Sequence, residues 1–553
     1  MTRIKDPIYG YVEIDADIVR NIIDSPYFQR LRNIRQTSYT PLYPSSNHNR
    51  YVHSLGVYFL GKMAWRAIHQ QLKEIIHKKD LTLEIELDEL RRLFELACLL
   101  HDVGHAPFSH TGEHLYKGKD GGKELYEQLK EAIGDDSFSA DLDRACEESR
   151  EPAPHETMSC FVAIKQFSKY IESPWMRGFF SRCILGLQFS AKDSIECKLY
   201  NCVIGLLNSS IIDVDRLDYI IRDAETMGFK SVSVDYERLL GGLKIDPENV
   251  QTGYEKNALS VIENAIYAHD SEKKWVQNHP TIHYEMYILR HSMAFLNSCF
   301  TPSGMQNPLF CYDALTEEGT SLLSKDNDIP VSLLGDEDVL HLLKRYREHD
   351  ELAREFFARN KRRKPLWKTE AEYIVLFEKN IGENSAAINT LHDGMSELEG
   401  YCRKVMNTPI INASAYQHLL DDLGGIEQNA LLNSDDKKAL IAGRQKIKHW
   451  MEILKNAAEE NDIPFDFVIV PAQKFSSNFE KATIEDIPIY FPLLGEAHKL
   501  GTISTVLKAL PKTNTKFFFL FYRTPTDENG EPKPHSKPDL VQNVAKLLRQ
   551  GSV

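Results

Sequence analysis

The sequence has few cysteines, and their arrangement excludes several classes of protein. Nine cysteines are scattered over 553 residues, and no two of them have the CxxC spacing that is typical of zinc ribbons and redox motifs. An odd and dispersed set of this kind predicts a reducing compartment, not a secreted domain held by disulfides. We therefore expect a cytoplasmic protein.

Long apolar runs are missing as well. No stretch approaches the roughly 18 apolar residues that a membrane span needs. The first ten residues, MTRIKDPIYG, lack the basic segment followed by an apolar run that marks a signal peptide. We expect a soluble protein with no membrane partner.

Positive charge is in deficit. Lysine and arginine number 66 against 80 aspartates and glutamates, which gives a formal net charge of −14. Such a balance does not favour a long polyanion as ligand, although a local basic pocket remains open. Nucleic acid is thus an open but not a favoured partner, and small anions are compatible with the composition.

The remaining composition is that of a large globular protein with room for about two to four domains. Apolar residues recur at helical spacing over most of the first 300 residues, for example over 51–68 and 90–100. Three short β-rich runs follow after residue 461, at 465–470, 487–491 and 517–522. We predict a mainly α fold in three parts, namely a helical core (1–300), a helical extension (301–460) and a small C-terminal α/β lobe (461–553).

The most informative local feature is the string HDVGHAPFSH at 101–110, which places His101 and Asp102 at the end of an apolar helix. Burying two ionisable side chains there is costly unless they are paired or bind a cation. Imidazole and carboxylate together suit Fe, Mn or Zn, and further ligands must come from elsewhere. His53 and the aspartates of DVDRLDYIIRD (213–223) are the candidates.

Each of these motifs has a plainer explanation when it is taken alone. An HD dipeptide is common, His53 fits a capped or core histidine, and DVDRLDYIIRD fits a salt-bridged surface helix. The ordered occurrence of all three, each with distinctive neighbours, favours a shared metal site over coincidence.

The order His53, His101-Asp102, Asp215 resembles the HD-domain metal-dependent phosphohydrolases. Neighbouring strings narrow the resemblance to their deoxynucleoside triphosphate (dNTP) triphosphohydrolases from mammals and bacteria, and the likeness covers about residues 3 to 240. These strings are DPIYG (6–10), FQRLR (28–32), HNR (48–50), HSLGV (53–57), His155-Glu156 and MGF (227–229). The resemblance implies an HD-domain catalytic core over 1–300 that hydrolyses a dNTP to deoxynucleoside and triphosphate. We expect no sterile-alpha-motif domain, because the matching text begins at the first residues.

The resemblance also implies roles for individual residues. A divalent transition metal (Fe, Mn or Zn) would be held by His53, His101, Asp102 and Asp215, with Mg or Mn accompanying the substrate. The catalytic set would be His105, His110, Glu113 and His155. Within it, His110 would be the general acid, and Glu113, where the family has aspartate, would orient it.

Substrate contacts are implied in the same way. The phosphates would be gripped by Arg50, Arg216 and Tyr219, and Arg216 replaces a family lysine with a planar fork. Gln36 and Asp223 would contact the deoxyribose 3′-hydroxyl. The segment after Gln36 reads Thr-Ser-Tyr where the mammalian family members are rich in glycine, so selectivity for the 2′-deoxy sugar is less firmly implied than hydrolysis.

A regulatory site is a further hypothesis. Asp24, Gln29 and Arg32 match the residues with which the mammalian family members bind an activating guanine nucleotide, and those enzymes assemble as oligomers. We expect a homo-oligomer, a dimer or tetramer, with a guanine nucleotide as candidate activator. An ordinary helix with an exposed arginine is the competing interpretation of this segment.

Two other functions stay open. One is an HD phosphohydrolase or nuclease that acts on another phosphoester, such as a modified nucleotide or a single-stranded end. The other is a nucleotide-sensing protein of a defence or signalling assembly, with a degenerate site. The complete set of four candidate metal ligands argues against degeneration.

Overall fold

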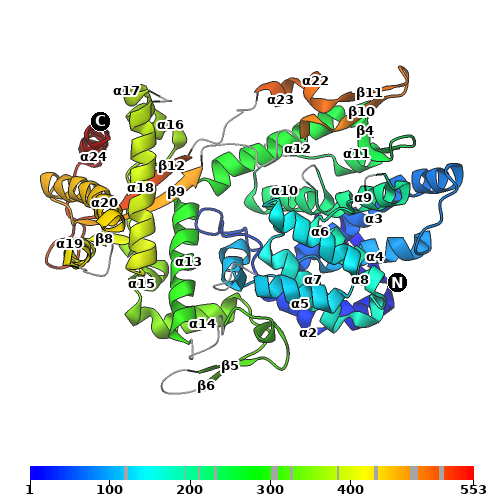
Figure 1. Ribbon diagram of the computed structural model, residues 1–553, viewed down its shortest axis with the longest axis horizontal. Coiled ribbons are helices and arrows are strands. Elements are labelled where there is room, and N and C mark those ends of the chain that lie inside the picture. The colour runs from blue at the N-terminus through cyan, green and yellow to red at the C-terminus, as the bar shows by residue number, and fades with distance from the viewer. Residues whose placement is uncertain are drawn as a thin grey trace. The chain divides into compact units, whose positions relative to one another are not determined.

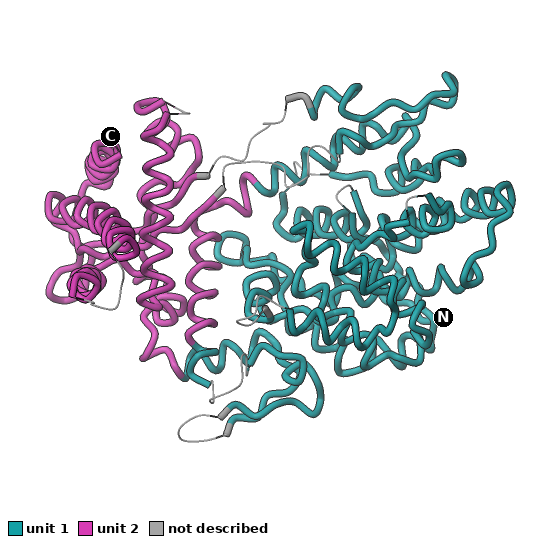
Figure 2. The backbone as a smooth tube through the Cα atoms, in the orientation of Figure 1, with its two compact units in different colours: residues 1–273, 296–345, 477–512 teal, residues 274–295, 346–476, 513–553 magenta. Residues whose placement is uncertain are grey.

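The computed structural model describes residues 1–117, 123–191, 193–209, 212–229, 233–300, 309–323, 328–382, 385–428, 434–473, 484–509 and 516–552. These residues form two compact units, each assembled from separate stretches of the chain (Figure 2). Unit 1 comprises residues 1–273, 296–345 and 477–512, and unit 2 comprises residues 274–295, 346–476 and 513–553. The three-part division at residues 300 and 460 stays a prediction.

Unit 1 is built mainly from helices, most of which are labelled in Figure 1. They are α1 (Ala16–Ile18), α2 (Pro26–Gln29), α3 (Arg50–Lys78), α4 (Leu87–Leu100), α5 (Lys123–Ile133), α6 (Asp136–Glu147), α7 (Pro154–Gln166), α8 (Pro174–Leu185), α9 (Ile195–Leu207), α10 (Val214–Met227), α11 (Tyr236–Gly241), α12 (Leu259–Glu272), most of α14 (Asp336–Tyr346), α22 (Leu500–Ile503) and α23 (Thr505–Ala509). Its strands are β1 (Thr2–Asp6), β2 (Gly10–Ile14), β3 (Leu243–Asp246), β4 (Gln251–Glu255), β5 (Thr320–Leu323), β6 (Asp328–Val331), β10 (Pro488–Phe491) and β11 (Glu496–Lys499).

Unit 2 combines helices with one sheet. Its helices are most of α13 (Pro280–Cys299), α15 (Glu351–Phe357), α16 (Glu370–Tyr373), α17 (Lys379–Ile381), α18 (Ala386–Val405), α19 (Ala413–Gln428), α20 (Ser434–Glu460) and α24 (Lys537–Gly551), and its strands are β7 (Lys364–Pro365), β8 (Ile410–Asn412), β9 (Asp466–Gln473) and β12 (Lys516–Tyr522). The predicted mainly α fold, with a helical core and a smaller sheet-containing region, is confirmed.

Local sequence explains where the helices of the site begin and end. The Asn49 side chain accepts a hydrogen bond from Val52 N (3.2 Å) and so caps α3. Asp213 caps α10 by accepting from Arg216 N at 2.7 Å. Gly228 ends α10 in the left-handed region at φ 70°, which a residue without a side chain adopts readily.

The strand-like runs near the C-terminus fall into two different sheets. β9 and β12 pair antiparallel in the sheet β7-β12-β9-β8, with Phe519 opposite Val470. The run at 487–491 is β10, which pairs in parallel with β4 in the sheet β11-β10-β4-β3 of unit 1. Each of the three runs therefore forms the strand that its composition predicts, but they do not share one sheet.

Each unit has its own hydrophobic core. In unit 1, α3 packs against α4 and α10, and α8 packs against α4 and α7. In unit 2, α18 packs on β9 and β12 and contacts α20 and α24. Over the described ranges, no helix combines the length and apolarity that crossing a bilayer requires.

Candidate active site

Four predicted metal ligands come together in unit 1 from three helices. His53 lies in the first turn of α3, His101 and Asp102 directly follow α4, and Asp215 lies in the first turn of α10. His53 Nε2 is 2.9 Å from Asp215 Oδ1 and 3.3 Å from His101 Nε2. Asp102 Oδ2 lies 3.7 and 3.6 Å from these two imidazole nitrogens.

This spacing fits a transition-metal ion. Ligand atoms that share an ion at about 2.1 Å stand roughly 3.0–3.4 Å apart in octahedral or tetrahedral geometry. His53, His101 and Asp215 present one such set of ligand atoms, and Asp102 adds a further carboxylate oxygen beside them. Two imidazoles and two carboxylates are the donors that Fe, Mn and Zn accept.

Neighbouring groups turn both imidazoles so that Nε2 faces the cluster. His53 Nδ1 lies 2.7 Å from Asp218 Oδ2, and His101 Nδ1 lies 3.0 Å from the Cys98 carbonyl oxygen. Contacts of this kind fix the orientation of metal-binding histidines. The sequence interpretation gave Asp218 no role, although its position one helical turn after Asp215 was an available signal.

Asp218 is itself held by a buried chain of charges. Arg222 donates to both carboxylate oxygens of Asp218 at 2.9 and 3.0 Å and contacts Asp6 Oδ2 at 3.0 Å. Gly56 makes this approach to α3 feasible, because a Cβ atom there would stand 1.9 Å from Asp218 Oδ1. Asp6 of DPIYG and Gly56 of HSLGV therefore help to hold Asp218 in place beside His53.

The electrostatics of the cluster favour ionised carboxylates. Burial alone would raise the pKa of Asp102, but Arg50 at 2.8 Å and the two imidazoles hold it well below its usual range. Burial of Asp218 is likewise outweighed, chiefly by Arg222, which lowers the pKa of Asp218 to about 2. Burial would lower the pKa of His53, yet its hydrogen bonds to Asp215 and Asp218 raise it to about 9.

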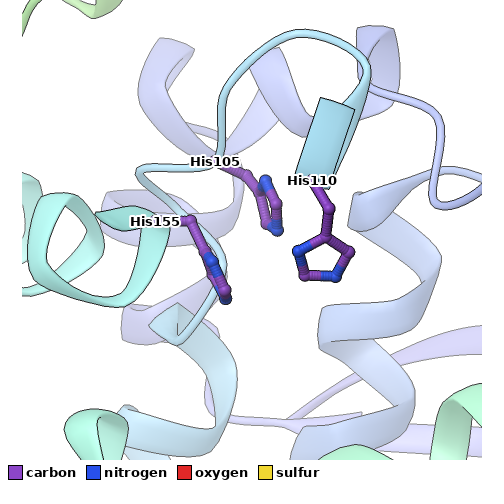
Figure 3. Close-up of side chains that lie close together, drawn as sticks. All are labelled: His105, His110 and His155. Carbon is purple, nitrogen blue, oxygen red and sulfur yellow. The ribbon is translucent and has the colours of Figure 1, made fainter. Parts of the chain in front are cut away.

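Three further histidines form a second cluster (Figure 3). His105 and His155 stack with ring centroids 4.3 Å apart, and the His110 ring stands edge-on to both at 5.2 and 5.1 Å. His105 is fully buried, and neither of its ring nitrogens has a hydrogen-bond partner among the described residues. Burial and the nearby cation Arg50 lower its pKa, so His105 is neutral.

Glu113 connects the other two histidines of this cluster. One carboxylate oxygen lies 3.1 Å from His110 Nδ1, and the other forms a short contact with His155 Nδ1. The two histidines outweigh burial and depress the pKa of Glu113 far below its usual range. The glutamate at this position is therefore long enough to reach both rings while it remains ionised.

Arg50 links the two clusters. Its guanidinium contacts Asp102 Oδ2 at 2.8 Å and donates from Nε to Ser109 Oγ at 2.9 Å. It also lies 3.5 Å from His110 Nε2. A buried arginine between a carboxylate and an imidazole group supplies positive charge beside the second cluster.

Gln36 and Asp223, the predicted sugar contacts, meet at His48. Gln36 N donates to the His48 carbonyl oxygen at 3.1 Å, and His48 Nε2 lies 2.7 Å from Asp223 Oδ1. The structure thus brings the two residues to one place, and His48 is a neighbour that the sequence interpretation did not assign.

The other predicted contacts are distributed over α10 and the N-terminal segment. Arg216 and Tyr219 follow Asp215 on α10, where the Tyr219 ring lies 6.4 Å from that of His269. Gln29 Oε1 accepts from Arg32 Nε at 2.7 Å, and Arg32 also stacks on Tyr51 at 3.6 Å. Asp24 is exposed at the end of the preceding turn.

A small polar cavity opens beside the metal-ligand cluster. Its lining includes His101, Asp215, His155, Glu156 and Asn208. Burial raises the pKa of Glu156, whose oxygens accept from Ala153 N at 2.9 Å and Asn208 Nδ2 at 2.8 Å. The cavity is thus lined by residues of both the metal-ligand cluster and the second, histidine cluster.

Comparisons with known proteins identify a domain within this region. A model of the HD domain matches residues 50–173, which include His53, His101, Asp102, His105 and His155. Residues 50–173 thus match an HD domain, and Asp215, the fourth predicted metal ligand, lies outside the matched range.

Sequence relatives include the deoxynucleoside triphosphate triphosphohydrolase SAMHD1 of Homo sapiens, 30% identical over 245 residues, which cover 43% of this chain and 35% of that protein. The Xenopus laevis protein of the same name is 31% identical over 241 residues, covering 42% and 35%. The putative HD domain-containing protein L394 of Acanthamoeba polyphaga mimivirus is 26% identical over 321 residues, covering 56% and 61%. The chain thus spans about a third of the length of the vertebrate relatives that it matches.

Two solved structures share the fold over nearly the whole chain. A hypothetical protein from Aquifex aeolicus has a TM-score of 0.53 at 18% identity and covers 94% of this chain and 96% of its own. A phosphohydrolase from Bacteroides thetaiotaomicron has a TM-score of 0.53 at 16% identity, covering 95% and 100%. At this identity the likeness concerns the fold alone.

Proposed function

We propose that this protein is a metal-dependent dNTP triphosphohydrolase that converts a dNTP and water to deoxynucleoside and triphosphate. The observation that carries the proposal is the connection of two clusters through Arg50. This guanidinium contacts the candidate metal ligand Asp102 and lies 3.5 Å from His110 Nε2. A polyphosphate chain needs both a cationic cradle and an activating centre within one short reach.

Four residues would hold the metal, namely His53, His101, Asp102 and Asp215. When bound, a divalent ion such as Fe, Mn or Zn supplies Lewis-acid chemistry at a phosphoryl oxygen. The donor spacing and the depressed pKa of Asp102 support this assignment. We infer that Mg or Mn accompanies the triphosphate, because the phosphates carry more negative charge than the cradle offsets.

Arg50, Arg216 and Tyr219 are proposed to bind the phosphates, and a planar guanidinium suits bidentate contact with phosphate oxygens. The neutral, buried His105 offers an imidazole with no hydrogen-bond partner among the described residues, which is suited to a phosphate oxygen or its proton. His155 completes this wall of the cradle.

His110 is proposed as the general acid that gives its proton to the leaving 5′-oxygen. Glu113 would hold the ring through Nδ1 and so leave Nε2 directed to the leaving group. A carboxylate partner also stabilises the protonated imidazole, which an acid catalyst needs before the transfer.

Gln36 and Asp223 are proposed to bind the 3′-hydroxyl of the sugar. Gln36 Oε1 is buried without a hydrogen-bond partner among the described residues and can accept from a hydroxyl. A buried acceptor that is satisfied only by substrate discriminates strongly against analogues that lack the donor.

Regulation, assembly and location extend the proposal. We infer that Asp24, Gln29 and Arg32 bind a guanine nucleotide and that this promotes assembly of a homo-oligomer, a dimer or tetramer. We also infer a cytoplasmic location, because the nine cysteines are odd in number and scattered along the chain. Asp24→Ala with Arg32→Ala should abolish any effect of GTP on oligomer mass and rate, and equal responses in variant and parent would refute the regulatory site.

The test of the activity is a screen of all dNTPs and NTPs, alone and in pairs, with Mn or Mg and identification of the products. The proposal expects inorganic triphosphate from at least one dNTP and no turnover by Asp102→Ala. Asp88→Ala is the matched control, because Asp88 is exposed at the start of the same helix that Asp102 follows. Monophosphate with pyrophosphate would indicate another phosphohydrolase, and no turnover at all would favour a nucleotide sensor.

A further inference from the structure

The loop that carries His110 has an unusual backbone. Phe108 and Ser109 both lie in the left-handed region, at φ 58° and 52°. This region costs a residue with a side chain roughly 1–2 kcal/mol, and two in succession persist only where surrounding contacts fix them. The residues that hold this loop therefore matter for the position of His110.

A distant carboxylate makes one of these contacts. Asp336, the first residue of α14, is 3% exposed, and its Oδ1 accepts a hydrogen bond from Phe108 N at 2.7 Å. Its other oxygen accepts from Arg35 N at 3.1 Å. One buried side chain thus binds two backbone segments that are far apart in sequence.

The two segments are adjacent, and each leads to a residue of the candidate active site. Phe108 leads into Ser109 and His110, and Arg35 immediately precedes Gln36. Ser109 Oγ donates to the Arg35 carbonyl oxygen at 2.5 Å and accepts a hydrogen bond from Arg50 Nε at 2.9 Å. Asp336 therefore holds both the segment that leads to the proposed acid His110 and the segment that leads to the proposed sugar contact Gln36.

A buried cation reinforces the same connection. Arg30 donates to the carbonyl oxygens of Leu334, Val103 and His105 at 2.8, 2.9 and 2.9 Å. Arg30 therefore ties Leu334 to the loop that follows α4. Leu334 lies two residues before Asp336, whose carboxylate accepts from Phe108 N. Asp336 and Arg30 satisfy backbone groups of the loop that would otherwise be buried without partners.

We propose that Asp336 is a positioning residue that sets the distance between the acid His110 and the sugar contact Gln36. This inference rests on the proposed function only for the roles of His110 and Gln36. Asp336 touches neither candidate metal ligands nor the histidine cluster directly, so its effect on the reaction passes through Phe108 and Arg35. Misplacement of a catalytic group by a fraction of an ångström lowers turnover more than binding.

Asp336→Asn is the direct test, because the amide keeps one acceptor and turns an NH₂ toward a backbone N–H. Asp338→Asn is the matched control. It removes the same charge from the same helical turn, and Asp338 contacts only Gly335 N, at 2.8 Å, among the hydrogen bonds described for its side chain. Both variants are compared with the parent as full-length, metal-loaded protein.

Three measurements separate positioning from a general loss of structure. Hydrogen exchange of peptides that contain Phe108 and Arg35 reports the two contacts directly. Calorimetry with inorganic tripolyphosphate reports the cradle, and steady-state kinetics on the dNTP found in the screen report kcat and KM. For Asp336→Asn we expect faster exchange in both peptides and a kcat about tenfold lower, with a smaller change in KM. Asp338→Asn should match the parent.

Equal exchange rates and an equal kcat for the two variants would overturn the inference. If Asp336→Asn does not fold, Asp336→Glu replaces it, since the longer carboxylate displaces both contacts by one methylene, and an unchanged kcat for that variant would also overturn it. A parent that hydrolyses no nucleotide refutes the proposed function alone, because the exchange comparison still decides the role of Asp336.

Discussion

His53 Nδ1 and Asp218 Oδ2 lie 2.7 Å apart, although 165 residues separate them in the chain. This contact leaves His53 Nε2 directed at Asp215 and His101, so the carboxylate on α10 determines which nitrogen of the α3 imidazole is offered to a metal. The same helix thus carries one candidate ligand, Asp215, and the group that orients another candidate, His53.

Replacing Asp218 should weaken metal binding without removing a ligand. We expect Asp218→Asn to lower the affinity for Mn or Zn by about 10- to 100-fold, which is the usual effect of losing such a partner. Competition with a chromogenic chelator measures it. Glu225→Gln, at an exposed site on the same helix, should leave the affinity unchanged. Equal affinities for the two variants would show that Asp218 does not orient His53.

Gly56 should tolerate no side chain. A Cβ at this position would stand 1.9 Å from Asp218 Oδ1 and 2.5 Å from Arg222 Nη2, so Gly56→Ala should lower the free energy of unfolding by about 1–3 kcal/mol. Gly205→Ala on α9, where no atom lies within 4 Å, should instead raise it by about 0.5–1 kcal/mol. Urea denaturation compares them. A Gly56→Ala protein as stable as Gly205→Ala would contradict the packing described.

Glu113 should affect turnover more than phosphate binding. A glutamine has one acceptor and cannot bind the Nδ1–H groups of His110 and His155 together, so Glu113→Gln should lower kcat about 100-fold. Calorimetry with tripolyphosphate should show a far smaller loss. Glu131→Gln, exposed on α5, is the control. A kcat equal to that of the control would show that Glu113 does not orient the acid His110.

The stability of the protein should depend on pH through Asp336. Burial raises the pKa of Asp336 from an ordinary value near 4 to about 6. Between these values the native carboxyl holds a proton that the unfolded chain has released, so its contribution to stability is full below pH 4 and is lost as the pH rises to 6. The full effect is at most about 3 kcal/mol.

The measurement is the free energy of unfolding of parent and Asp336→Asn from pH 4 to pH 7. The parent should lose stability relative to the variant as the pH rises through this window, because asparagine does not titrate. Parallel pH profiles would mean that the Asp336 carboxyl ionises as it does in the unfolded chain.

Sequence periodicity and spacing were enough to predict the elements that carry the metal-ligand cluster. The apolar faces at 51–68 and 90–100 lie within α3 and α4, and DVDRLDYIIRD forms most of α10. Local chemistry decides these features, because capping and amphipathicity act over a few residues. The choice of His53, the HD pair and Asp215, which the fold brings together, came instead from the resemblance of their order to that of the HD-domain phosphohydrolases.

Contacts between distant segments could not be predicted in this way. The pairing of Asp336 with Phe108 joins residues 228 apart, and β10 pairs with β4 and not with the neighbouring β-rich runs. Nothing in the local pattern of either segment specifies its partner, because β pairing and buried hydrogen bonds depend on the assembled core. Asp218 lies between the two cases, since its helix was predicted but its partner on α3 was not.

In the proposed reaction, water attacks the phosphorus next to the sugar and the 5′-oxygen leaves. Hydrolysis of the best dNTP in H₂¹⁸O, followed by mass spectrometry of both products, tests this directly. We expect one ¹⁸O atom in the inorganic triphosphate and none in the deoxynucleoside. Label in a deoxynucleoside monophosphate or in pyrophosphate, with no labelled triphosphate, would contradict it.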